Sequence, residues 1–104
     1  MKRGEIWWAD LPKPIGKRPV LLLSRDSAIV VRDFIVAAQI TTVIRNLPVE
    51  VHLGKQDGMP RDCVANLDVL TTIPKAQLTD KICQLSLEKM RKIEESLKFA
   101  LEME

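Results

Sequence analysis

Hydrophobic and polar residues alternate with a period of two along most of the chain. In residues 49–53, three apolar residues alternate with Glu50 and His52, which predicts a half-buried strand whose two polar side chains share the outer face. Other short runs of β-branched and apolar residues end at Pro, Gly or clustered polar residues, as strands do. The strands expected on these grounds are residues 6–9, 19–24, 34–40, 49–53, 63–70 and 81–85.

Only the C-terminal segment has the three- and four-residue spacing of an amphipathic helix. The residues that share this spacing are Leu87, Met90, Ile93, Leu97, Ala100 and Leu101. Ser86 is the expected N-cap, and Glu88 places a negative charge in the first turn, where it complements the helix dipole. The pattern also allows a short helical turn after Pro74. Short antiparallel strands followed by one long helix predict a mainly β (α+β) fold, a small β-barrel.

The composition is that of an ordinary globular protein. With 104 residues, of which 46% are hydrophobic and 29% charged, the chain is expected to form a single domain over residues 1–104. It contains no run of about 18 apolar residues and no apolar signal segment, so we expect a cytoplasmic protein without a membrane-spanning helix. Cys63 and Cys83 are then expected to stay reduced, as buried apolar side chains.

Charge is distributed unevenly, although 16 basic and 14 acidic residues leave a formal net charge of only +2. The charged side chains of residues 1–32 are mostly basic, whereas those of residues 86–104 are mixed in sign. If a polyanion binds, the N-terminal third is therefore its expected surface.

Several common catalytic and cofactor motifs are missing. His52 is the only histidine, so the sequence offers neither the paired ligand spacings of a zinc site nor a pair of imidazoles for acid–base catalysis. His52 itself is expected on the surface. The four glycines are scattered and make no phosphate-binding loop. We therefore expect neither a metal site nor a cofactor.

The first candidate functional residue is Arg18, which lies at the end of a Pro/Gly loop, directly before an expected buried strand. Pro19 restricts the backbone beside it, and a guanidinium held in this way suits a phosphate, including the negative charge that develops when a phosphodiester is attacked. A solvated arginine, or one paired with Asp26 or Asp33, is an equally good alternative from the pattern alone.

Thr41 and Thr42 end the third expected strand, where their hydroxyls can donate to a phosphate oxygen. Ordinary β-branched strand residues before a turn are the alternative, and the residue pattern by itself favours that interpretation. Trp7 and Trp8 are adjacent, so on a strand they face opposite sides. We expect one in the core and the other available to stack on a base or to contact a second subunit.

Taken in order, these segments resemble the MazF/PemK toxins of bacterial toxin–antitoxin systems, over nearly the whole chain. The matching residues are Arg3, Gly4, Glu5, Ile6 and Trp7; Lys17, Arg18, Pro19 and Ser24; Ile40, Thr41 and Thr42; residues 64–68 with Thr72, Lys75 and Leu78; and Leu85 and Ser86 before the last helix. No single segment is specific, but their order and spacing together are.

The resemblance implies an SH3-like barrel that forms a homodimer and acts as a metal-independent, sequence-selective endoribonuclease on single-stranded mRNA. In this family the ribose 2′-hydroxyl attacks the adjacent phosphate, leaving 2′,3′-cyclic phosphate and 5′-hydroxyl ends, and a cognate antitoxin neutralises the enzyme. Arg18 matches the family's catalytic arginine and Thr41 its catalytic threonine. Because a guanidinium stays protonated in proteins, we assign Arg18 to charge stabilisation and Thr41 to orienting the phosphate.

Further side chains are expected to contact the RNA. They are Lys13, Lys17, Ser24, Gln39 and Thr42. Gln39 stands where the family usually has proline, and the loop between Leu11 and Lys17 is short and lacks the acidic residue often found before the basic pair. These departures bear on the cleavage sequence and on the fit of the antitoxin.

The alternative function is a noncatalytic protein of the same fold. Such a protein would be a CcdB-like inhibitor of DNA gyrase, or an RNA-binding barrel that leaves its RNA intact. The presence of Arg18 and Thr41 in their matching contexts argues for the nuclease.

Overall fold

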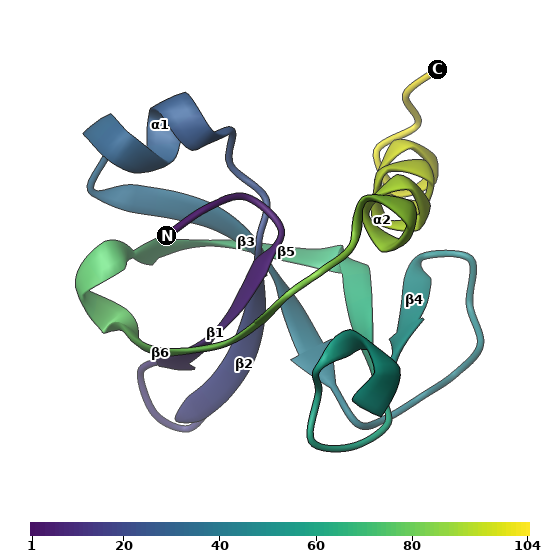
Figure 1. Cartoon of the computed structure of the whole chain (residues 1–104), viewed down its shortest axis with the longest axis horizontal. Coiled ribbons are helices and arrows are strands. Elements are labelled where there is room, and N and C mark those ends of the chain that lie inside the picture. The colour runs from purple at the N-terminus through teal and green to yellow at the C-terminus, as the bar shows by residue number, and fades with distance from the viewer.

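The computed structural model describes all 104 residues and consists of one curled sheet with helices packed on it (Figure 1). The sheet has six strands in the order β4-β5-β3-β2-β1-β6, and every neighbouring pair is antiparallel. The strands are β1 (Glu5–Asp10), β2 (Lys17–Leu22), β3 (Phe34–Thr41), β4 (Glu50–Leu53), β5 (Cys63–Pro74) and β6 (Leu78–Gln84). The helices are α1 (Asp26–Val31) and α2 (Leu87–Ala100), with 3₁₀ turns at Lys55–Asp57 and Lys75–Gln77.

The predicted elements are present in their predicted order. All six expected strands, the C-terminal helix and the helical turn after Pro74 form, so the mainly β fold with a long terminal helix is confirmed. The helix α1 was not expected. Only Ala28 and Ile29 of this helix are buried, while Val30 and Val31 are exposed, and so short a segment has no amphipathic period.

The strand β5 is longer than predicted and bends along its length. Its second half pairs with the start of β3, down to the partners Phe34 and Pro74. Between Ala38 and Gln39 the pairing jumps from Leu70 to Asn66, which leaves residues 67–69 as a bulge. Only the first half of β5 also pairs with β4. Because a bulge bends and twists a strand, the sheet curls here into a half-barrel.

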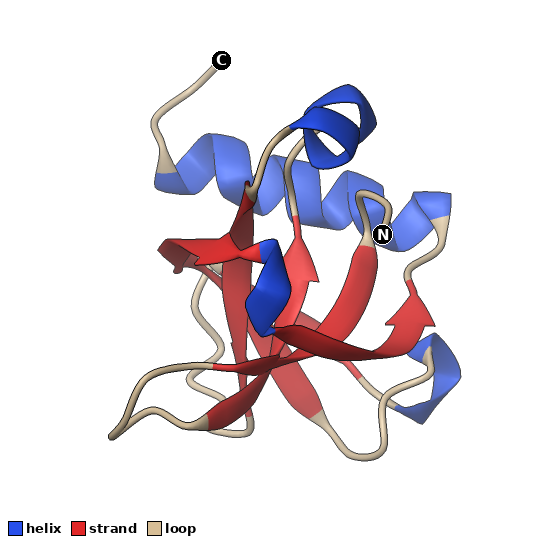
Figure 2. Ribbon diagram, turned by 90° about the vertical axis from the view of Figure 1, so that its left-hand side faces the viewer, coloured by secondary structure: helices blue, strands red, loops and turns tan.

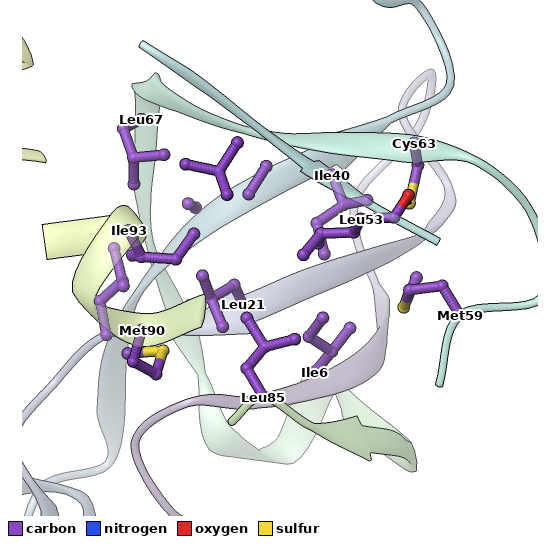
Figure 3. Packing of buried hydrophobic residues seen from close by; sticks show 14 residues of the cluster. Ile6, Leu21, Ile40, Leu53, Met59, Cys63, Leu67, Leu85, Met90 and Ile93 are labelled. Atoms are coloured by element: carbon purple, nitrogen blue, oxygen red, sulfur yellow. The ribbon is translucent and has the colours of Figure 1, made fainter. Parts of the chain in front are cut away.

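Hydrophobic side chains fill both faces of the central strands. Along β2, Leu21 belongs to the larger cluster, between the sheet and α2, whereas Val20 and Leu22 belong to a second cluster on the other face. Met90 and Ile93 of α2 point into the larger cluster near Leu21 (Figure 3). Burial on both faces explains why β2 is a continuous apolar run and does not alternate.

The helix α2 lies across one side of the curled sheet (Figure 2). The expected N-cap is confirmed, because the Ser86 Oγ accepts a hydrogen bond from the Lys89 backbone N–H at 3.1 Å. No helix in the structure combines the length and the apolar composition that a bilayer crossing requires.

The expected outward placement of Glu50 is wrong, although His52 is exposed as predicted. Glu50 is 7% exposed, and its Oε1 accepts hydrogen bonds from the backbone N–H groups of Arg45 at 2.9 Å and Leu47 at 3.3 Å. Its Oε2 has no hydrogen-bond partner within the protein. The connection before β4 folds back over the start of the strand, so this carboxylate serves as an acceptor for loop amides that the strand pattern does not reveal.

Cys63 and Cys83 are free thiols, as expected. Cys63 is buried, Cys83 is half-buried, and the Cys83 Sγ lies 3.7 Å from the Sδ of Met59. Burial raises the pKa of the Cys63 thiol to about 11 and raises that of Cys83 in the same direction. Neither thiol is therefore a thiolate nucleophile near neutral pH.

Candidate active site

A cavity of about 420 Å³ opens where β2 begins and β3 ends. In Figure 1 both strand ends lie in the lower half of the molecule, and the end of β3 lies beside the connection between β4 and β5. The lining residues are Trp8, Arg18, Pro19, Ile40, Thr41, Thr42, Met59, Pro60, Arg61 and Cys63. This volume is within the range of pockets that bind small ligands, about 300–1,000 Å³.

The register of β2 and β3 explains why Arg18 and Thr41 line one cavity. The antiparallel ladder pairs Leu21 with Ala38 and ends at Val20 with Gln39. Continued by two residues, the same register would place Arg18 opposite Thr41. It stops first because Pro19 has no backbone N–H to donate, so the two strands separate and leave space between their ends.

The Arg18 guanidinium is available to a ligand. Its side chain is exposed and makes no hydrogen bond or ion pair in the structure, while its backbone is fixed in the pair with Ala9 of β1. The alternative pairing with Asp26 or Asp33 does not occur. Asp26 instead accepts a hydrogen bond from the Arg3 backbone N–H at 2.7 Å.

Thr41 is half-buried at the last position of β3. Its Oγ1 accepts a hydrogen bond from the Val43 backbone N–H at 3.1 Å, which holds the side chain against the turn that follows. The hydroxyl proton is not used by that bond and can still be donated into the cavity. Thr42 is exposed and also lines the cavity.

Met59, Pro60, Arg61 and Cys63 form a wall of the cavity that the sequence pattern did not reveal. The 3₁₀ turn Lys55–Asp57 carries the chain there, and the Asp57 Oδ2 accepts a hydrogen bond from the Gly54 backbone N–H at 2.9 Å. Lys89 of α2 also pairs with that oxygen, at 3.6 Å. Met59 and Cys63 belong to the larger core cluster, near Ile40, where the cavity meets the core (Figure 3).

This wall brings a second arginine, Arg61, to the cavity. Its side chain is exposed and forms no ion pair, so two uncompensated guanidinium groups line one cavity with two hydroxyls. The only sequence signals for the wall were Asp57, Gly58 and Pro60, which mark a turn but do not say what the turn approaches.

Trp7 and Trp8 face opposite sides of β1, which confirms that expectation. The Nε1 of Trp7 donates to the Glu5 Oε1 at 2.9 Å, and its ring packs against the second core cluster. Trp8 lines the cavity on the other face, and the Lys17 Nζ lies 5.5 Å from the centre of its ring. Lys17 and Trp8 also line a second hollow beside the cavity.

The buried carboxylate of Glu5 anchors this part of β1. Burial acts to raise its pKa, but hydrogen bonds from Trp7, Lys81 and the Lys2 backbone more than offset this and lower it. The Lys81 Nζ lies 3.1 Å from the Glu5 Oε2. This cation is therefore committed to a structural ion pair, unlike Arg18.

Three of the expected RNA-contacting side chains lie outside both hollows. Lys13 is exposed in the loop between β1 and β2, and Gln39 is half-buried in β3 between Val20 and Asn66. Ser24 lies beyond the end of β2, where its Oγ accepts a hydrogen bond from the Val36 backbone N–H at 2.9 Å. The structure thus brings together Arg18, Thr41 and Thr42 in the cavity, with Lys17 in the adjoining hollow.

Comparison with known proteins assigns the chain. Residues 2–101 match the family model of the PemK-like, MazF-like toxins of type II toxin–antitoxin systems. The chain belongs to this family. The probable endoribonuclease MazF5 of Mycobacterium tuberculosis is 39% identical over 96% of this toxin and 92% of its own length. Endoribonuclease EndoA of Bacillus subtilis is 35% identical over 97% and 94%.

A solved structure with the same fold is that of an endoribonuclease in complex with its cognate antitoxin from a mycobacterial species. It superimposes on the toxin with a TM-score of 0.90 at 29% identity, and the match covers 100% of the toxin and 97% of that chain. The predicted family and the predicted mainly β, SH3-like barrel fold are confirmed, with the sheet curled into a half-barrel. So is the predicted enzyme class, a toxin–antitoxin endoribonuclease.

Proposed function

We propose that this toxin cleaves single-stranded mRNA at selected sequences in the cavity that holds Arg18 and Thr41, without a metal ion. The observation that carries the proposal is that an unpaired guanidinium and a hydroxyl with a free proton line one cavity at adjacent strand ends. These are the donors that a phosphodiester needs when negative charge builds up on its oxygens.

The reaction is an internal transfer within the RNA. The ribose 2′-oxygen bonds to the adjacent phosphorus as its proton passes to water, and the bond from phosphorus to the 5′-oxygen breaks as that oxygen takes up a proton from water. The products are a 2′,3′-cyclic phosphate and a 5′-hydroxyl end. Arg18 stabilises the charge on the non-bridging oxygens, and the Thr41 hydroxyl donates to one of them and orients the phosphate.

The partners follow from the same surfaces. The uncompensated charge of Arg18, Arg61 and Lys17 favours a polyanion, either RNA or an acidic segment of a cognate antitoxin. A solved relative is in complex with its cognate antitoxin, which supports an antitoxin as one of these partners.

A homodimer is supported by large apolar side chains on α1 and β3 that a monomer leaves in water, such as Val31, 72% exposed, and Phe34, 56% exposed. We place the toxin in the cytoplasm, where its mRNA substrate is found.

Cleavage in the presence of EDTA tests the proposal. Purified toxin should cut a long single-stranded RNA and leave 5′-hydroxyl ends, which can be mapped by ligation and sequencing. Arg18→Ala should lower the cleavage rate by at least about a hundredfold, the scale for loss of a transition-state donor. Arg91→Ala is the matched control, because Arg91 is exposed on α2, its side chain makes no hydrogen bond or ion pair, and it lies outside the cavity and outside the apolar surface of α1 and β3.

The alternatives give different results in the same assay. Intact RNA that shifts on a gel would favour a noncatalytic RNA-binding barrel. Cleavage that appears only when a divalent metal is restored would contradict the metal-free mechanism. Equal rates for Arg18→Ala and the wild type would remove Arg18 from the site.

A further inference from the structure

A second hollow, of about 510 Å³, adjoins the active cavity and has no role in the mechanism above. The two share Trp8, Met59 and Pro60, so they meet at the Trp8 ring. The lining that is specific to the second hollow is Lys17, Gly58, Asp80, Lys81 and Ile82. RNA whose scissile phosphate lies at Arg18 would therefore place a flanking nucleotide at Trp8, at the mouth of this hollow.

Trp8 offers an aromatic platform on which a base can stack. It is half-buried, which restricts the ring, and the Lys17 Nζ lies over the ring, 5.5 Å from its centre. Lys17 is exposed and makes no ion pair, so its flexible side chain can swing from the ring to an incoming phosphate. Stacking on an aromatic ring accepts every base, so Trp8 alone gives no base selectivity.

Asp80 supplies a selective group directly beside the ring. Trp8 and Asp80 are cross-strand partners in the β1–β6 ladder, so their side chains emerge side by side on one face of the sheet. The Asp80 side chain makes no hydrogen bond or ion pair and is exposed, whereas the neighbouring Lys81 is held by Glu5 at 3.1 Å. A carboxylate with all its acceptor sites free thus stands at the edge of a stacking platform.

An ionised carboxylate only accepts hydrogen bonds, and this property selects among the four bases. Guanine alone presents two adjacent donors on its Watson–Crick edge, N1–H and the N2 amino group, which match the two carboxylate oxygens. In adenine and cytosine the amino group neighbours an acceptor nitrogen, and in uracil the N3–H lies between two carbonyls. Each of those three edges would set a lone pair against the second oxygen of Asp80.

The geometry points to a guanine-binding subsite in the second hollow, in which the base stacks on Trp8 and donates to Asp80 while Lys17 contacts its phosphate. This inference rests on the proposed function for the position of the scissile phosphate. To the proposed function it adds the identity of one base next to the cleavage site, and it names Asp80 as the group that recognises this base.

Sequencing of cleavage ends from an RNA library with randomised positions tests the subsite. Guanine should be enriched about tenfold at one of the two nucleotides that flank the cut, the scale of one bidentate contact. Asp80→Asn should reduce that enrichment to about one, because an amide presents one acceptor and one donor in place of two acceptors. Asp68→Asn makes the same chemical change at an exposed aspartate whose side chain makes no hydrogen bond or ion pair and which lies outside both hollows, and should keep the enrichment. The same base distribution for the wild type and Asp80→Asn would overturn the subsite.

Binding of non-cleavable RNA separates this inference from the proposed nuclease. Tryptophan fluorescence should be quenched by a 2′-O-methyl trinucleotide with a central guanine at about a tenth of the concentration needed with adenine. Asp80→Asn should remove the difference, and Trp8→Phe should remove the signal. Guanine-selective quenching without any RNA cleavage would leave the subsite standing and refute the nuclease proposal. Cleavage without selective quenching would refute the subsite alone.

Discussion

Replacing Gly58 with alanine tests whether close contact with β6 positions the wall of the active cavity that Met59, Pro60, Arg61 and Cys63 form. Gly58 has φ +100°, in the left-handed region, and a Cβ added there would lie 2.6 Å from the Cβ of Cys83. Neither Cβ can rotate away, because both are bonded directly to the backbone. The turn must therefore move, and Met59, Pro60 and Arg61 would move with it.

The cost of the substitution has two parts. A non-glycine residue in the left-handed region costs about 1–2 kcal/mol. Backbone shifts that relieve an overpacked contact cost about 1–3 kcal/mol more. Gly16 separates the two parts, because it has φ +70° but an added Cβ would meet nothing within 4 Å. Gly16→Ala should thus show only the first cost. A domain of ordinary stability, about 5–15 kcal/mol, survives either change.

Chemical denaturation measures both variants against the wild type. We expect Gly58→Ala to lose at least about 1 kcal/mol more free energy of unfolding than Gly16→Ala. The double variant Gly58→Ala/Cys83→Gly removes the clashing atom from the other side, so it should show a favourable coupling between the two sites. RNA cleavage by folded Gly58→Ala should also fall, because Arg61 shifts relative to Arg18. Equal losses for the two alanine variants would show that contact with Cys83 does not position this wall.

Two further predictions concern single groups at the site. Thr41→Val should lower RNA cleavage by about a hundredfold, and Thr41→Ser, which keeps the hydroxyl, should restore most of it; equal rates for valine and serine would exclude the hydroxyl. Because the pKa of Glu5 is lowered in the folded state, its contribution to stability is present above its ordinary value of 4.5 and is lost as the pH falls through the lower folded value. The free energy of unfolding of Glu5→Gln, measured across that pH range, should lack this part of the pH dependence. A profile equal to that of the wild type would contradict the prediction.

The elements that could be predicted are those whose own pattern of apolar residues shows which positions are buried. The helix α2 has its apolar spacing and its Ser86 cap within one segment, and β2 has an apolar run that both core clusters bury. The helix α1 escaped prediction because it contributes only Ala28 and Ile29 to the core. Glu50 was misplaced because its partners are loop amides and not strand neighbours.

The same distinction applies to the candidate site: some of its residues have a local sequence signal and others do not. Arg18 and Thr41 were predictable because each sits at a strand end in a recognisable segment, although only the β2–β3 register shows that the two ends meet. Arg61 and Asp80 carry no such local signal. Arg61 reaches the cavity through a turn that Asp57, Lys89 and the fit of Gly58 hold in place, and Asp80 matters only because β6 pairs with β1 beside Trp8.

A single backbone property connects the fold to the chemistry. Pro19 cannot donate to the ladder, so β2 and β3 stop pairing just before the register would bring Arg18 and Thr41 together. Had the ladder continued, backbone hydrogen bonds would close the gap, and the two side chains would be cross-strand neighbours on a filled surface. Because it ends there, their backbones stay aligned by the strands behind them while the space between them stays open. The strands thus fix the two backbone positions from which the Arg18 and Thr41 side chains reach the cavity, which is the part of the preorganisation required by the proposed electrostatic catalysis that the fold supplies.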